Sequence, residues 1–184
     1  MTRRRLPGEI VDLEPLSRAH ISERYAAWFN DPEVTRFNSH GSRVMTLADV
    51  EAYVARVEDS ESEAVFAMIA KDKGVHVGNI TLQKIDAANK SAEYAIILGD
   101  KEYWGRGIAA EASKLLIEFG FKDLGLHRIW CGTSVANIPM QKLAERSGFT
   151  KEGVRREAML KNGEFVDVIE YGVLARDLPH ELLQ

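Results

Sequence analysis

The sequence contains a single cysteine, Cys131, and only five prolines among 184 residues. One cysteine cannot form an internal disulfide, and so few cysteines are typical of a protein in a reducing compartment. No segment approaches the roughly 18 uninterrupted apolar residues of a membrane-spanning helix. The basic start at residues 1–5 is not followed by the apolar stretch of a signal peptide. These absences predict a cytoplasmic protein that does not enter a membrane.

The sequence also lacks a strong excess of either charge. Its formal net charge is −4, which gives no overall attraction to nucleic acid or anionic lipid. The five histidines are scattered and, with the lone cysteine, form no metal-ligand spacing. We therefore expect no nucleic-acid partner and no metal. The length predicts one domain over residues 1–184, with residues 1–8 as a flexible basic N-terminal segment.

The apolar pattern alternates between the strand and the helix period along the chain. Strands are expected at 9–16, 64–70, 75–82, 93–98 and 126–134, followed by a hairpin that turns at Asn162–Gly163. Helices are expected over 18–29, after Thr46, from Ile108 and after Asn137, with N-caps at Ser17, Thr46 and Asn137. A phase slip at Gly78–Asn79 predicts a β-bulge. The fold class is therefore α/β or α+β, with a mixed sheet.

The segment WGRGIAAEA, residues 104–112, places two glycines and an arginine at the start of a predicted helix. A helix start presents free amide donors and a partial positive charge, and glycine lets a large anion approach them. Gly105, Arg106 and Gly107 thus form either a pyrophosphate cradle or simply a tight turn. A Walker A motif is excluded because no Lys-Ser or Lys-Thr follows. A relaxed dinucleotide fingerprint fits weakly, and it keeps a dinucleotide oxidoreductase open as a third reading.

Four segments together resemble the GNAT N-acetyltransferase superfamily, and within it the RimJ/RimL-like branch: the strand 93–98, YWGRGIAAEA, LHRIW and VANIPMQKLAERSGF. The resemblance covers about residues 9–175. It implies a mixed, mostly antiparallel sheet flanked by helices, with a splayed strand pair that holds acetyl-CoA. It also implies transfer of an acetyl group to a primary amine by direct attack on the thioester. A catalytically weak acetyl-CoA-binding sensor or interaction module is the alternative.

By this resemblance, main-chain groups of Ile96 and Leu98 meet the pantetheine arm, and the glycine loop binds the pyrophosphate. The implied cofactor-binding set is Ile96, Leu98, Gly105, Arg106, Gly107, Ile108, Ala109 and Asn137. The sequence departs from the family pattern at Glu102, where relatives have Gln or Arg. It departs again at Met140 and Ala144, where relatives often have the Ser or Tyr that protonates the leaving thiolate.

Three residues are candidates for catalysis. Glu93 starts the strand that leads to the glycine loop and is the leading candidate for the general base, although a glutamate at a strand start is usually solvated. Asn137 either contacts the cofactor or a bound water, or simply caps its helix. Asp167 shares a face with Phe165, Ile169 and Tyr171, where it either lines a pocket or is paired in the core. A backbone amide near Ile97 is expected to stabilise the oxyanion.

The sequence identifies the acceptor amine less clearly than the cofactor. The segment 25–56 falls where relatives shape the acceptor pocket, and Trp28, Phe37 and His40 line that pocket unless the segment is a flat solvated loop. Tyr171 is either a core aromatic or a group facing the substrate. The acceptor is a protein N-terminus, an amino sugar or another small amine. A homodimer through the terminal hairpin, residues 154–174, is possible because two-fold dimers are the commonest oligomer.

Overall fold

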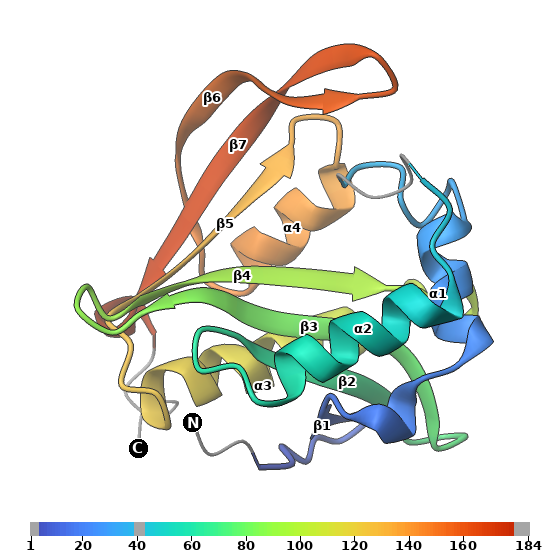
Figure 1. The fold of residues 1–184 in the computed structure, drawn as a ribbon. Helices are drawn as coiled ribbons and strands as arrows, with labels where there is room; N and C mark the ends of the chain where they lie inside the picture. Colours follow the sequence, from blue (N-terminus) through green and yellow to red (C-terminus); the bar gives the residue numbers. More distant parts are fainter. Residues whose placement is uncertain (1–3, 39–42, 179–184) are drawn as a thin grey trace.

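The computed structural model describes residues 4–38 and 43–178, which fold around one seven-stranded sheet in the order β1-β2-β3-β4-β5-β7-β6 (Figure 1). Neighbouring strands are antiparallel except for β4 and β5, which run parallel. The expected mixed, mostly antiparallel sheet is therefore confirmed. Its strands are β1 Val11–Pro15, β2 Ala64–Ala70, β3 Val75–Asp86, β4 Ser91–Leu98, β5 Arg128–Ser134, β6 Thr150–Lys161 and β7 Glu164–Leu174.

Helices cover both faces of the sheet (Figure 1). They are α1 Glu23–Asn30, α2 Leu47–Glu58, α3 Ile108–Lys122 and α4 Ile138–Arg146, with short 3-10 turns η1 Arg18–His20, η2 Lys101–Tyr103 and η3 Ala175–Asp177. In β2, Phe66 packs in the core formed with α3, whereas its neighbour Val65 packs in a second core with α1 and α2. This alternation explains why the sequence of β2 is almost continuously apolar, since both of its faces are buried.

The helix predicted over residues 18–29 is wrong as a single element. Ser17 precedes only the 3-10 turn η1, and Ile21 is extended with φ −68° and ψ 125°. The helix α1 starts afresh at Ser22, whose hydroxyl accepts a hydrogen bond from the amide of Tyr25 at 3.2 Å. A second capping serine inside the apolar pattern therefore interrupts the helix.

The predicted bulge in β3 is confirmed. Met68 faces Gly78, but the next residue, Ile69, faces His76, so Val77 is the extra residue. A side chain at Gly78 would collide with the backbone of Leu98 in β4, which explains the glycine. The sequence did not predict a second bulge, between Gln83 and Asp86, where Lys84 has a positive φ of 50°.

Residues 4–8 pack on the domain, although they were expected to be flexible. Leu6 is buried and bridges to Leu13 in β1 through reciprocal 2.9 Å backbone hydrogen bonds. Arg5 contacts the buried carboxylate of Asp12 at 2.5 Å. Residues 1–3 of the predicted segment lie outside the described residues. The N-terminal segment is therefore part of the sheet edge from residue 4 onward.

The loop after β4 rests on α1. Gly99 is buried against the indole of Trp28, and a Cβ at Gly99 would overlap the atoms of that ring. Trp28 in turn packs edge-on against His76, with ring centres 4.9 Å apart. Burial lowers the pKa of His76 to about 4, so this imidazole is a neutral core group at physiological pH. The end of β4 thus has a fixed position relative to α1.

The substitution Gly99→Ala is expected to lower the free energy of unfolding by about 1–3 kcal/mol, because the added methyl overpacks the contact with Trp28. Thermal unfolding followed by circular dichroism measures the loss as a lower Tm. The matched control is Gly153→Ala, where a Cβ meets no atom within 4 Å among the described residues and the Tm should change little. Equal Tm values for both variants would contradict the packing assigned to Gly99.

Candidate active site

The strands β4 and β5 pair over only three residues. Ser91, Ala92 and Glu93 face Arg128, Ile129 and Trp130, and no further pairs follow. Beyond Glu93 and Trp130 the strands diverge, and β5 rises away from β4 toward α4 (Figure 1). The rest of β4 therefore has main-chain groups on one side that no neighbouring strand of the described sheet uses.

The direction of those main-chain groups follows from the pairing with β3. The amide of Gly99 donates to the carbonyl of Val77 in β3 at 3.0 Å. Main-chain groups alternate in direction along a strand, so the amide and carbonyl of Ile97, two residues earlier, also face β3. The same alternation turns the main-chain groups of Ile96 and Leu98 toward the opening between β4 and β5. The expected oxyanion donor near Ile97 is therefore not Ile97 itself, since its amide faces β3. Ile96 and Leu98 are the residues whose amides face the opening.

The glycine loop follows η2 and leads directly into α3. Gly105 and Gly107 have positive φ values of 73° and 84°, a region that side chains disfavour, and Gly107 is the N-cap of α3. No side chain caps this helix end, and a Cβ built at Gly105 meets no atom within 4 Å among the described residues. The first amides of α3 are thus open to a large anion, so the residues fit a pyrophosphate.

The loop is anchored to β4 by Trp104. Its indole Nε1 donates to the carbonyl of Leu98 at 2.8 Å, which closes the loop onto the strand end. The side chain of Arg106 lies to one side of the loop, where it contacts Asp72 at 2.8 Å and lies 4.6 Å from the centre of the Tyr103 ring. Arg106 therefore contributes positive charge beside the helix start while its head group is bonded to Asp72.

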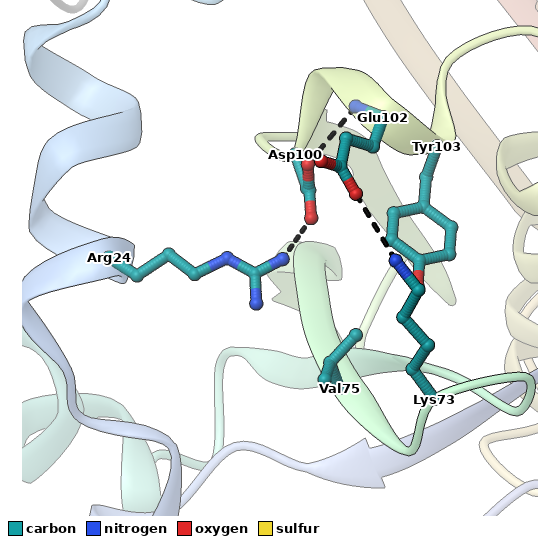
Figure 2. Close-up of a pocket in the computed structure, with 6 residues that line it drawn as sticks. All are labelled: Arg24, Lys73, Val75, Asp100, Glu102 and Tyr103. Carbon is teal, nitrogen blue, oxygen red and sulfur yellow. Dashed lines mark hydrogen bonds and ion pairs between the residues drawn. The ribbon is translucent and has the colours of Figure 1, made fainter.

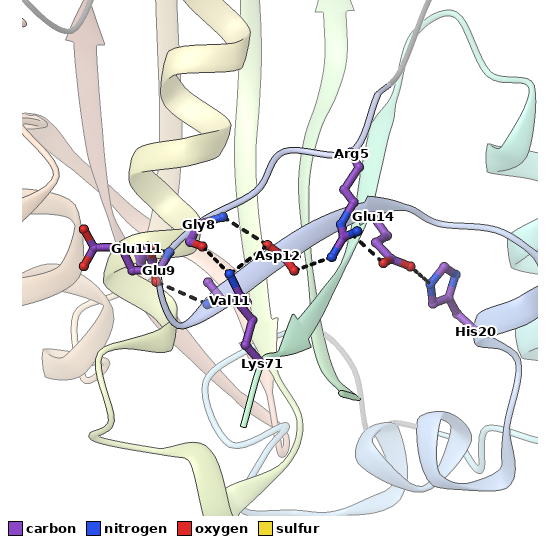
Figure 3. Close-up of polar contacts among 9 residues, drawn as sticks. All are labelled: Arg5, Gly8, Glu9, Val11, Asp12, Glu14, His20, Lys71 and Glu111. Atoms are coloured by element: carbon purple, nitrogen blue, oxygen red, sulfur yellow. Dashed lines mark hydrogen bonds and ion pairs between the residues drawn. The ribbon is translucent and has the colours of Figure 1, made fainter. Parts of the chain in front are cut away.

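The first turns of α3 are fixed from two sides. On one side, Tyr94 and Ser113 share a 2.7 Å hydrogen bond, and Ser113 donates to the carbonyl of Ala109. On the other side, the carboxylate of Glu111 accepts hydrogen bonds from the amides of residues 9–11 (Figure 3). The strand β4 and the N-terminal segment thus hold the helix start in a set orientation.

A hollow of about 280 Å³ lies next to the loop, lined by Arg24, Lys73, Val75, Asp100, Glu102 and Tyr103 (Figure 2). The side chains of Arg24 and Asp100 are bonded to each other, and Lys73 contacts Glu102 at 3.3 Å. Glu102 is the residue that departs from the family pattern. Its carboxylate is directed to Lys73 rather than left unpaired near the glycine loop.

Glu93 lies on the sheet face opposite Tyr94, at the point where β4 and β5 separate. Its Oε2 accepts a hydrogen bond from Gln83 at 3.0 Å and contacts the ammonium of Lys84 at 2.7 Å. The side chain is 17% exposed. Sequence reasoning selected Glu93 but missed Gln83, Lys84 and Trp130, because a β-bulge and a parallel pairing bring them together without any sequence motif.

Asn137 caps α4. Its side-chain oxygen accepts from the amide of Met140 at 3.3 Å, and its amide group donates to the hydroxyl of Thr133 at 3.1 Å. The helix cap predicted from sequence is confirmed. The residue lies between the end of β5 and the start of α4.

Two further candidates lie away from Glu93. Asp167 accepts a 2.8 Å hydrogen bond from the amide of Glu157, at a bulge of β6, and alternation places it on the opposite sheet face from Glu93. Tyr171 is 1% exposed, with its hydroxyl 3.5 Å from Glu145 of α4. Alternation also places Tyr171 on the face opposite Glu93, so neither side chain is on the same side of the sheet as Glu93.

The acceptor candidates in the segment 25–56 are also dispersed. Trp28 is buried in the core described above and supports the loop after β4. Phe37 is half-buried, with the guanidinium of Arg36 4.9 Å from its ring centre. His40 lies outside the described residues. Of the two described side chains, Phe37 is the one with exposed surface.

Comparisons with known proteins match this geometry. The family model of the acetyltransferase (GNAT) domain matches residues 11–150. An uncharacterised N-acetyltransferase, p20 of Bacillus licheniformis, is 31% identical over 156 residues, covering 82% of this chain and 85% of its own. The spermidine N(1)-acetyltransferase of Escherichia coli K12 is 28% identical over 162 residues, covering 86% and 83%.

This chain belongs to the GNAT acetyltransferase family. A solved GCN5-related N-acetyltransferase from Brucella melitensis superposes with a TM-score of 0.82 at 27% identity, covering 100% of this chain and 84% of that one. RimL, a ribosomal L7/L12 alpha-N-protein acetyltransferase solved with coenzyme A, has the same fold, with a TM-score of 0.84 at 18% identity over 93% of this chain and 98% of its own. This GNAT enzyme is thus an acetyl-CoA-dependent N-acetyltransferase.

No group of three His, Cys, Asp or Glu side chains within residues 4–38 and 43–178 is arranged to hold a metal ion. No helix in the same residues is long and apolar enough to cross a membrane.

Cys131 follows Trp130, the residue of β5 that pairs with Glu93, and its side chain is 1% exposed. Burial, reinforced by the charges of Glu170 and Glu93, raises the pKa of its thiol to about 12. The thiol is therefore almost entirely protonated at pH 8, so Cys131 is a poor acyl carrier.

Cys131 is accordingly expected to resist Ellman's reagent at pH 8 in the folded enzyme and to react at once in guanidinium chloride. Absorbance at 412 nm measures both reactions. Rapid stoichiometric modification of the folded protein would contradict the burial and the raised pKa. A second check is Cys131→Ala, which should keep amine acetylation within about threefold, because a structural thiol takes no part in the chemistry.

Proposed function

We propose that this GNAT enzyme transfers the acetyl group of acetyl-CoA to the primary amine of a small aliphatic molecule, with Glu93 as the general base. The observation that carries the proposal is the position of Glu93. It is the last residue of β4 that pairs with β5, so its carboxylate stands at the apex of the diverging strands. A base is needed there, because an amine must lose a proton to attack.

The cofactor is proposed to bind along the opening between β4 and β5. The open amides of Ile108 and Ala109, with Gly105 and Gly107, take the pyrophosphate, and Arg106 adds positive charge. Main-chain groups of Ile96 and Leu98 meet the pantetheine arm; the Leu98 carbonyl already accepts from Trp104, so its amide is the group available.

When bound, acetyl-CoA supplies a thioester carbonyl that an amine attacks directly. Glu93 accepts the proton from the ammonium, and the amides that face the opening donate to the developing oxyanion. Met140 and Ala144 provide no hydroxyl to protonate the leaving sulfur. None is required, because a thiol with an ordinary pKa of about 8.5 leaves as a thiolate near neutral pH.

A small amine is favoured over the other acceptors by two considerations. The Glu93 side chain is 17% exposed and already bonds the primary ammonium of Lys84, which is the group that a small aliphatic amine presents. Spermidine acetyltransferases are among the relatives that align over more than four-fifths of this chain. The likeness to RimL, at 18% identity, is a likeness of fold alone.

Substitution of Gly107 by Asp is expected to weaken acetyl-CoA binding at least about tenfold, because a carboxylate then occupies the place of the pyrophosphate. Isothermal titration calorimetry with acetyl-CoA measures the change. The matched control is Gly125→Asp, at a glycine with a similar φ of 62° and open space around it. Equal affinities in the two variants would place the cofactor elsewhere.

The substitution Glu93→Gln is expected to lower kcat for amine acetylation by about 10²–10⁴-fold, with acetyl-CoA affinity retained, because the amide cannot accept the proton. Release of free thiol measures the rate with 1,4-diaminobutane, glucosamine 1-phosphate and an N-terminal peptide as acceptors. Glu164→Gln, on the exposed hairpin, serves as the control. A Glu93→Gln enzyme within twofold of the unmodified rate excludes Glu93 as the base, and a preference for the peptide excludes the small amine.

A further inference from the structure

Lys84 occupies an unusual position beside the proposed base. It lies on the second bulge of β3, with a positive φ of 50° that is uncommon for a side-chain-bearing residue. From there its ammonium contacts the Oε2 of Glu93 at 2.7 Å and lies 5.4 Å from the centre of the Trp130 ring. A charged carboxylate and an indole therefore hold one ammonium between them.

These two partners are the groups that bind alkylammonium ions in proteins. A carboxylate forms a charge-assisted hydrogen bond with the ammonium, and an indole within about 6 Å attracts it electrostatically. Glu93 and Trp130 are also the last residues that pair between β4 and β5. The ammonium held there is at the apex of the diverging strands.

The lysine head group is chemically a primary alkylammonium, the same group that a primary amine presents at neutral pH. Its side chain is 67% exposed, whereas that of Glu93 is 17% exposed. Ion pairs with such an exposed partner contribute little to stability, so Lys84 can leave the carboxylate for solvent without disturbing the fold. Gln83 stays bonded to the same carboxylate oxygen and keeps it in place.

Other carboxylates on this face are bonded to guanidinium groups, Glu152 to Arg128 and Glu170 to Arg155. Glu170 of β7 faces the same side of the sheet as Glu93 and contacts Arg155 at 2.6 Å. A guanidinium bonded in this way is not a mimic of a primary ammonium. Of these three carboxylates, Glu93 is the one that holds a primary ammonium, the group that the acceptor presents.

We propose that Glu93 and Trp130 form the binding site for the ammonium group of the acceptor, and that Lys84 occupies this site as an internal competitor until the acceptor displaces it. The proposal rests on the proposed function, because it takes Glu93 as the group that receives the acceptor. It assigns Trp130 to acceptor binding and Lys84 to the control of acceptor affinity. If Lys84 occupies the site for about nine-tenths of the time, its removal raises acceptor affinity about tenfold.

The test compares Lys84→Met with Lys90→Met. Lys90 is also exposed and also has a φ of 50°, so the two variants lose the same charge from the same backbone conformation. The probe is 1,4-diaminobutane, titrated while the indole N–H resonance of Trp130 is followed by NMR. Turnover with acetyl-CoA is measured in parallel.

Lys84→Met is expected to bind the diamine several-fold to tenfold more tightly than Lys90→Met, with a matching decrease in the KM for the diamine and no change in the KM for acetyl-CoA. Adding Trp130→Leu to Lys84→Met should reverse the gain. Equal affinities in the two lysine variants, or weaker binding by Lys84→Met, would overturn the proposal.

The two readouts separate this proposal from the proposed function. A Trp130 shift that differs between the variants, without acetylation of any amine, supports the ammonium site and counts against the proposed function. Amine acetylation that depends on Glu93, with the same KM for the diamine in both lysine variants, supports the proposed function. It would overturn the role assigned to Lys84.

Discussion

The short parallel pairing of β4 with β5 is the constraint on which the rest of the site depends. Three residue pairs join the strands, and their divergence leaves the main chain of Ile96 and Leu98 without a strand partner on one side. Unpaired main-chain groups inside a sheet are costly unless something satisfies them. An extended amide-bearing ligand such as pantetheine would supply such partners, which supports the proposed course of the cofactor along β4.

Around this opening, each boundary is held by a separate contact. Trp104 joins the glycine loop to the end of β4, Tyr94 and Ser113 join β4 to α3, and Glu111 joins α3 to the N-terminal segment (Figure 3). Asn137 fixes the start of α4 on the other side. The positions of the helix amides and the strand amides are therefore set before any ligand binds, which limits the ordering required on binding.

Much of the fold was predictable from the sequence, and there are physical reasons why the rest was not. Periodicity and capping residues predicted β2, the Thr46 helix and the Asn162–Gly163 turn, because each depends on neighbours in the chain. The split of the first helix at Ser22 was missed, since two capping serines fit one apolar pattern. The group of Glu93, Lys84 and Trp130 was not predictable, because only strand register brings those side chains together.

We propose that acetyl-CoA lies across the main-chain amides of β4 and of the start of α3. Amide hydrogen exchange, measured residue by residue with and without acetyl-CoA, tests it most directly. We expect acetyl-CoA to protect the amides of Ile96, Leu98, Ile108 and Ala109 from exchange, and to leave the amide of Ile97 unchanged because it already faces β3. Protection confined to residues around the Arg24–Asp100 hollow, with those four amides unchanged, would contradict it.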